Sequence, residues 1–163
     1  MQALSTTLLA LLIAMGVSAA TTLPAQDIPL LSRIFGNASY SNSSSASKSK
    51  RVEINLTTQR LKAYQGRRLV MQTKISSGKN RATPTGSFHA GPYKNEEHYS
   101  SLYDNAPMPW SIQVTGHIFI HGYSVVPEFP ASHGCIRVPI SGRNPAKRLF
   151  EWLDVGTPVQ IAY

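Results

Sequence analysis

Two residue types that together support thiol chemistry lie close to each other in this 163-residue sequence. The single cysteine, Cys135, lies in the run Ser-His-Gly-Cys-Ile-Arg, and His121 precedes it by fourteen residues in an Ile-His-Gly run. A free thiol has a pKa of about 8.5, so a thiol nucleophile needs an imidazole that takes its proton or stabilises its anion. The spacing predicts a nucleophile at Cys135 and its base at His121, joined by a loop that Pro127 and Pro130 restrict.

The backbone beside the cysteine is also suited to catalysis, because glycine lets a backbone amide approach a ligand closely. We expect the amides of Gly134 and Cys135 to stabilise a tetrahedral oxyanion. A lone cysteine that is only a small buried hydrophobe is one alternative. A second is a zinc site formed by His117, His121, His133 and Cys135. Strand residues four apart lie about 13 Å from each other, which is too far for one ion, so we expect no metal.

The composition is typical of one globular domain, with 42% hydrophobic and 15% charged residues, and it excludes a chain disordered throughout. The formal net charge is +8. From residue 52 to residue 163, 12 Lys and Arg residues accompany 7 acidic ones, and no basic stripe of helix length is present. We therefore expect solvated surface charge, or attraction to an anionic cell-wall polymer, rather than nucleic-acid binding.

The first 20 residues contain no charged side chain, and their apolar core at residues 8–15 is shorter than the about 20 residues that span a bilayer. This pattern predicts a secretory signal peptide, with small-residue cleavage sites ending at Ala19 or Ala25. An uncleaved membrane anchor is the alternative. We therefore expect an exported protein, in the periplasm or the cell-wall space.

Residues 21–51 form a polar, Ser-rich tether, since they hold too little apolar surface to offset the entropy of ordering. A single domain is then expected over residues 52–163. Alternating and short apolar runs predict strands at residues 52–56, 61–64, 69–75, 111–114, 117–121 and 158–162.

One helix is well marked near the end of the domain. Asn144 is a good N-cap, Pro145 suits the first helical position, and Gly156 follows the segment 146–153. Several strands followed by one packed helix and a last strand predict a mainly antiparallel β-sandwich with a small helical layer. His89 and His98 fall in predicted loops and are expected to be ordinary polar residues.

The motif Ser132-His133-Gly134-Cys135, preceded by His121-Gly122, resembles the signature of the L,D-transpeptidase (YkuD-like) catalytic domains, which cross-link peptidoglycan. Further similarity extends over most of residues 52–163. It includes the family's opening strand, its Ser-Ser-Gly and Thr-Pro-x-Gly segments, its Met-Pro-aromatic stretch, and its closing helix and strand, which match residues 52–61, 76–78, 83–88, 108–110 and 151–159.

The resemblance implies a cysteine-dependent acyltransferase that needs no cofactor and acts on peptidoglycan stem peptides. Cys135 would attack the third residue of a tetrapeptide stem and release D-alanine, with His121 as base and the Gly122 carbonyl orienting its imidazole. His133, Gly134 and the Cys135 amide would line the oxyanion and acyl site. The residues expected to contact the substrate are Ser132, Arg137, Tyr123 and Trp110. Carbapenem-type β-lactams would acylate the same cysteine.

Two positions differ from the usual family pattern. Tyr123 replaces a common Thr or Ser, and Val138-Pro139 follows Arg137 where relatives often carry Met or Leu and then Asn or Asp. These positions bear on the acceptor, which is another stem or a wall-linked protein. The alternative functions are an L,D-carboxypeptidase or endopeptidase of the same fold, in which water resolves the acyl-enzyme, and a non-catalytic wall-binding module.

Overall fold

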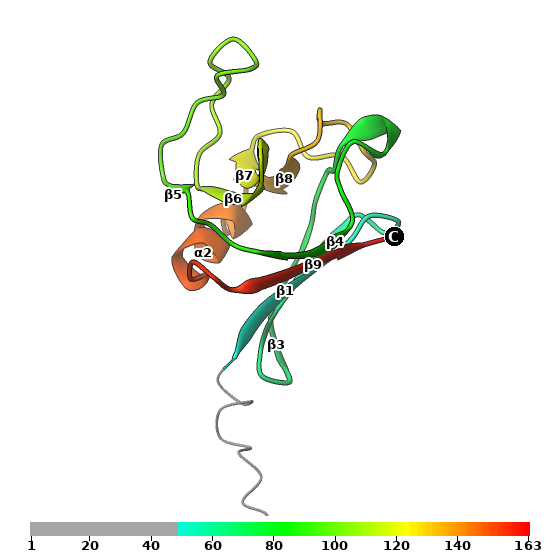
Figure 1. Cartoon of the computed structure of the whole chain (residues 1–163), viewed down its shortest axis with the longest axis vertical. Coiled ribbons are helices and arrows are strands. Elements are labelled where there is room, and N and C mark those ends of the chain that lie inside the picture. Colours follow the sequence, from blue (N-terminus) through cyan, green and yellow to red (C-terminus); the bar gives the residue numbers. More distant parts are fainter. Residues whose placement is uncertain (1–48) are drawn as a thin grey trace, which may run out of the picture. The chain divides into compact units, whose positions relative to one another are not determined.

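The strands form two β-sheets in the part of the chain that the structure, a computed structural model, describes: residues 49–163 (Figure 1). The predicted signal peptide and most of the predicted tether lie outside the described residues. The mainly β architecture with one small helix confirms the fold expected from the sequence.

The larger sheet has five strands in the order β3-β2-β1-β9-β4. These are β1 (Lys50–Asn55), β2 (Arg60–Gln65), β3 (Arg68–Lys74), β4 (Gly86–His89) and β9 (Pro158–Ala162). β1 and β9 are parallel, and the other pairs are antiparallel. The tether was expected to reach Arg51, but Lys50 and Arg51 already pair with β2, because their backbone continues the β1 ladder.

The smaller sheet has four strands in the order β5-β6-β7-β8. These are β5 (Lys94–Asn95), β6 (Ser111–Thr115), β7 (Ile118–Tyr123) and β8 (Ile136–Pro139). β7 and β8 are parallel, with Ile120 opposite Ile136. Parallel neighbours require a crossover connection. Residues 124–135 therefore return along the sheet, and Cys135 lies immediately before β8, two residues before Arg137, which is opposite His121 on β7.

Helix α2 (Pro145–Trp152) packs on the smaller sheet and begins as predicted. The Asn144 side chain accepts a hydrogen bond from the Lys147 amide at 3.0 Å, which satisfies one free N–H of the first turn. The apolar face predicted to meet the core does so through three fully buried side chains and one partly buried ring: Ala146, Leu149, Leu153 and Phe150. Residues 49–163 contain no helix that is long and apolar enough to span a membrane.

Four features were not predicted as regular structure: β4, β5, β8 and the short 3₁₀ turn η1 (Lys79–Arg81). Each is four residues or shorter, so none carries a hydrophobic period that the sequence could show. The segment between β5 and β6 is a long loop that projects away from both sheets in Figure 1. Its base lies beside the predicted catalytic residues.

Candidate active site

His121 is buried on β7, and its ring orientation is fixed by the backbone. Its Nδ1 lies 2.9 Å from the Gly122 carbonyl oxygen. A carbonyl only accepts, so Nδ1 carries the proton and Nε2 of the neutral ring is free to take one. Burial lowers the pKa of His121 to about 4, although the Gly122 hydrogen bond opposes this and the Arg137 charge adds to it. At neutral pH the imidazole is therefore an unprotonated base, and Gly122 has the orienting role expected of it.

Cys135 is half-buried, and it is a free thiol. Its Sγ lies 3.4 Å from the carbonyl oxygen of His117, which precedes β7. Burial raises the pKa of the Cys135 thiol, and a backbone hydrogen bond with Phe119 and the charge of Arg137 partly oppose the rise. The resting pair is thus a protonated thiol and a neutral imidazole, rather than a preformed thiolate–imidazolium ion pair.

The turn that presents the thiol is closed by Ser132. Its Oγ donates to the Cys135 carbonyl oxygen and accepts from the Gly134 amide at 3.1 Å. The Gly134 amide was expected to donate to an oxyanion, but this hydrogen bond already uses it. The Cys135 amide is the remaining candidate donor at this position.

A second segment, residues 78–83 after β3, is hydrogen-bonded to the turn that carries Cys135. The Thr83 hydroxyl is buried, donates to the Gly134 carbonyl at 2.6 Å and accepts from the Gly78 amide at 2.8 Å. A Cβ built on Gly78 would lie only 2.8 Å from the Gly134 Cα, so only glycine allows this approach of the two backbones. The sequence showed both segments as family-like motifs, but nothing in their spacing showed that they touch.

Gln59 connects this support to the turn between β1 and β2. Its side chain is 1% exposed, donates to Ser77 Oγ at 2.8 Å, and accepts from the Ser77 amide at 2.8 Å. The Ser77 carbonyl in turn accepts from the amides of Ala131 and Ser132 at 2.9 and 3.0 Å. A chain of hydrogen bonds therefore runs from the five-stranded sheet to the turn that holds the thiol.

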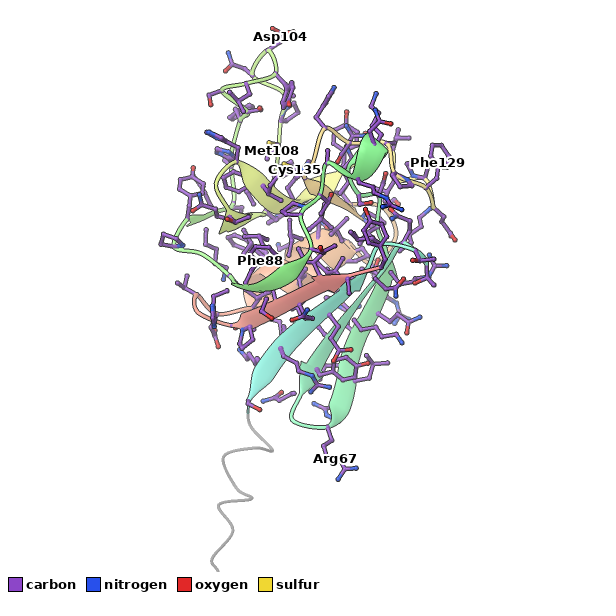
Figure 2. All side chains as sticks on the ribbon, turned by 45° about the vertical axis from the view of Figure 1, so that its right-hand side comes forward. Arg67, Phe88, Asp104, Met108, Phe129 and Cys135 are labelled. Atoms are coloured by element: carbon purple, nitrogen blue, oxygen red, sulfur yellow. The ribbon has the colours of Figure 1, made fainter. Side chains whose placement is uncertain are left out.

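A cavity of about 300 Å³ opens at the thiol and brings most of the predicted site residues together. Its lining residues come from the loop between β5 and β6, from β7 and the residue before it, and from β8 and the turn before it: Ser100, Leu102, Tyr103, Ala106, Pro107, Met108, His117, Ile118, His121, Tyr123, Ser132, His133, Cys135 and Arg137. Figure 2 shows Met108 beside Cys135, with Asp104 at the far tip of the projecting loop. The sequence did not indicate that this loop would form a wall of the site.

Trp110 lies outside the cavity lining. Its indole packs against the core, and the indole N–H donates to the Glu96 carboxylate at 3.2 Å. The ring also lies so close to Gly122 that a Cβ at that position would contact it. The side chain thus lies behind the base rather than in the cavity. A direct substrate contact by Trp110 stays a prediction that this geometry does not favour.

Two aromatic contacts define the cavity rim. His133 is exposed and stacks on Tyr103 of the projecting loop, with ring centroids 4.5 Å apart. Arg137 lies over the Tyr123 ring at 4.2 Å and forms no ion pair with any acidic residue in the described range. The rim therefore offers an unpaired guanidinium, and His133 lies on the surface rather than beside the buried imidazole.

Although His117, His121, His133 and Cys135 all line the cavity, they do not form a metal site. Within residues 49–163, no group of three or more His, Cys, Asp or Glu side chains could hold a metal ion. The ring of His121 is directed by Gly122 and that of His133 by Tyr103, so the donor atoms are not gathered at one point. His98, expected to be an ordinary loop residue, instead packs against Phe119 and the Tyr93 ring.

The sequence matches the family model for the L,D-transpeptidase catalytic domain (YkuD) over residues 49–161. The chain belongs to this family. A search of curated protein sequences found no significant match.

Solved structures give the same family. An L,D-transpeptidase from Stackebrandtia nassauensis is 25% identical with a TM-score of 0.63, over 71% of this chain and 56% of that one. One from Xylanimonas cellulosilytica is 32% identical with a TM-score of 0.59, over 71% and 61%. An L,D-transpeptidase solved in complex with imipenem, 22% identical over 70% and 59% with a TM-score of 0.61, shares the fold. This chain thus spans about three-fifths of the length of these relatives.

The Thr83 hydroxyl can be tested by exchange for a side chain of similar shape. Thr83→Val leaves the buried Gly134 carbonyl and Gly78 amide without their partner, so we expect a loss of about 2 kcal/mol in the free energy of unfolding. We also expect slower reaction of Cys135 with a thiol reagent, because the turn that carries it is no longer fixed. Urea unfolding and the alkylation rate measure the two effects. Thr83→Ser keeps the hydroxyl, and equal behaviour of the two variants would contradict this role.

The buried base makes stability depend on pH. Unfolded His121 takes up its proton near pH 6.5 and folded His121 only near pH 4, so between these values the unfolded state binds more protons. Stability therefore falls as the pH is lowered through this window, by up to about 3 kcal/mol from this residue. Urea midpoints at pH 7 and pH 4.5 measure the loss. His121→Asn keeps an N–H donor for Gly122 but does not titrate, so this variant should lose distinctly less stability between pH 7 and pH 4.5. An equal loss of stability in both proteins argues against a buried neutral imidazole.

Proposed function

We propose that this L,D-transpeptidase domain cross-links peptidoglycan through an acyl-enzyme on Cys135. The observation that supports the proposal is that the only thiol of the chain and a buried, unprotonated imidazole line one cavity of about 300 Å³. A thiol beside a base of this kind is the arrangement required for nucleophilic acyl transfer.

In the first step Sγ of Cys135 attacks the carbonyl carbon of the third residue of a tetrapeptide stem, and His121 Nε2 takes the thiol proton. The amide of Cys135 donates to the oxyanion that forms. His121 then gives the proton to the departing nitrogen as the C–N bond breaks. D-alanine leaves and a thioester remains on Cys135.

In the second step an amine of a neighbouring stem, or of a wall-linked protein, attacks the thioester. His121 takes a proton from the amine and returns it to the sulfur as the C–S bond breaks, so the thiol is regenerated and an amide cross-link is formed. Water competes for the same thioester, and its attack gives a carboxypeptidase instead. The apolar side chains of Leu102, Met108 and Ile118 at the cavity disfavour water.

Arg137 supplies the only fixed charge among the residues that line the cavity. A stem peptide carries carboxylates, and an unpaired guanidinium is well suited to bind one through two parallel hydrogen bonds. Tyr123, whose ring lies under the guanidinium, holds it in place. We assign substrate carboxylate binding to Arg137 on this ground, with Ser132 and Tyr123 completing that side of the pocket.

A peptidoglycan substrate requires that the enzyme act outside the cytoplasm. The uncharged residues 1–20 and the polar stretch to residue 49 suit an exported chain whose catalytic domain is tethered. We therefore place the enzyme in the periplasm or cell-wall space. The mechanism uses no metal or cofactor.

Imipenem acylation of the full chain tests the nucleophile. We expect intact-mass spectrometry to show a single imipenem adduct on the native protein and none on Cys135→Ala, because a β-lactam carbonyl accepts the same thiol. His121→Asn should form the adduct at least about tenfold more slowly, in the range of general-base contributions. An adduct on Cys135→Ala, or none on the folded and reduced native protein, would sink the acyl-enzyme proposal. Product analysis on muropeptides with and without added amine then separates cross-linking from hydrolysis.

The role of Arg137 can be separated from catalysis by kinetics. Arg137→Gln removes the charge, so we expect KM for a tetrapeptide stem to rise at least about tenfold, in the range for losing a charged hydrogen bond. Arg137→Lys keeps the charge but cannot form two parallel hydrogen bonds, so its KM should lie between those of the native protein and Arg137→Gln. A stem whose free carboxylates are amidated should not distinguish the variants. If the three proteins differ equally on both stems, Arg137 acts on the fold of the site and not on the substrate.

A further inference from the structure

Positive charge is concentrated in one part of the domain. Residues 49–74 hold seven Lys and Arg residues against one acidic residue, whereas residues 75–163 hold seven against six. The net charge is therefore +6 over β1–β3 and +1 over all the rest of the described chain. The strand pairing of these 26 residues determines on which surface of the domain the charge lies.

The strand register directs Arg51, Arg60, Lys62 and Lys74 to one face of the five-stranded sheet, whereas Lys50 and Arg68 both pair with Gln65 on the other side. Val52 pairs with Ala63 and Ile54 with Leu61, and all four side chains are buried in the core. Side chains alternate along a strand, so the intervening pairs point to the opposite, outer face. These pairs are Glu53 with Lys62, Asn55 with Arg60, and Arg60 with Lys74 of β3.

Most of the cations on this side have no acidic partner. Arg51 pairs with Glu53 at 3.0 Å and Arg60 with Glu128 at 2.9 Å. Four other cations are exposed and form no ion pair with the acidic residues of the described range: Lys62 and Lys74 on the outer face, and Arg67 and Arg68 at and beside the turn between β2 and β3. We call these four residues the basic set. Figure 2 shows Arg67 at the turn between β2 and β3, at the opposite end of the domain from Cys135.

The outer face is also hollowed and lined with groups that bind hydroxyls. A groove of about 530 Å³ runs over it, with Lys62 and Arg60 on its lining together with three side-chain amides: Asn55, Gln72 and Gln160. Glu53 also lines the groove, and its carboxylate is paired with Arg51. An amide both donates and accepts hydrogen bonds, as a sugar hydroxyl requires. The cations run along β2 and β3 for about seven residues, roughly 20 Å, so the surface is elongated.

From this combination we infer that the outer face of β1–β3 binds a linear acidic polysaccharide, with its sugar hydroxyls on the amides and its carboxylates on the basic set. Single-stranded nucleic acid fits less well, because it needs aromatic platforms for its bases. The one aromatic residue that β1–β3 direct to this face, Tyr64, is covered by the Arg51 guanidinium at 4.1 Å. A flat lipid surface would not reach the amides inside the groove. The inference goes beyond the proposed function and does not depend on the thiol.

The test is binding of an oligogalacturonate of about ten residues to the full chain, followed by calorimetry or fluorescence anisotropy at several salt concentrations. We expect affinity that weakens as salt increases, because exposed charges are screened. Changing the basic set to glutamine (K62Q, K74Q, R67Q and R68Q together) should weaken binding at least about tenfold and flatten the salt dependence. The imipenem acylation rate at Cys135 should stay unchanged, and Cys135→Ala should bind the oligogalacturonate normally.

A matched variant separates a specific surface from net charge. The substitutions R81Q, R143Q, K147Q and R148Q together remove the same four charges from exposed positions elsewhere. The inference requires that this variant bind nearly as well as the native chain. Equal losses in both variants would overturn it. It would also be overturned if a neutral dextran bound equally well, or if a single-stranded oligonucleotide or phosphatidylglycerol vesicles depended on the basic set more strongly than the glycan does.

Discussion

The two sheets of the domain meet where Gly78, after β3, lies against Gly134, before β8. No side chain larger than hydrogen fits between these backbones, since a Cβ on Gly78 would lie 2.8 Å from Gly134 Cα. The contact is held by Thr83, whose hydroxyl bonds both segments, and by the pairing of Ser76 with Arg137. The position of the thiol thus depends on backbone packing between distant parts of the chain and not on the local sequence alone.

The chemistry of the site follows from burial combined with one hydrogen bond. Removing the imidazole of His121 from water disfavours its charged form, and removing Cys135 from water disfavours the thiolate. The Gly122 carbonyl then selects which nitrogen of the neutral ring can accept a proton. In the proposed mechanism both groups are neutral at rest, and the proton moves from the thiol to the imidazole only as the sulfur attacks a substrate carbonyl.

The sequence was sufficient for the elements whose side chains repeat with a clear period. β1, β2, β6 and β9 were predicted because their side chains alternate between core and solvent. Helix α2 was predicted from its N-cap and from apolar residues that recur at helical spacing. Pairing between strands was not predictable, and the parallel alignment of β7 with β8 places Arg137 opposite His121 and Cys135 two residues before that position. Residue type and motif predicted Cys135 and His121 as site residues, and both line one cavity. The hydrogen bond that occupies the Gly134 amide was not predictable, because it depends on a turn geometry that residue types do not encode.

The half-buried state of Cys135 has a consequence for the survival of the enzyme. Peroxides and disulfides react with thiolates and hardly with thiols, so a cysteine whose pKa is raised is a poor target for oxidation. This chain has no second cysteine that could form a disulfide with an oxidised Cys135 and so allow its repair. By keeping the sulfur protonated, the fold slows the oxidation of the one thiol on which the proposed acyl transfer depends.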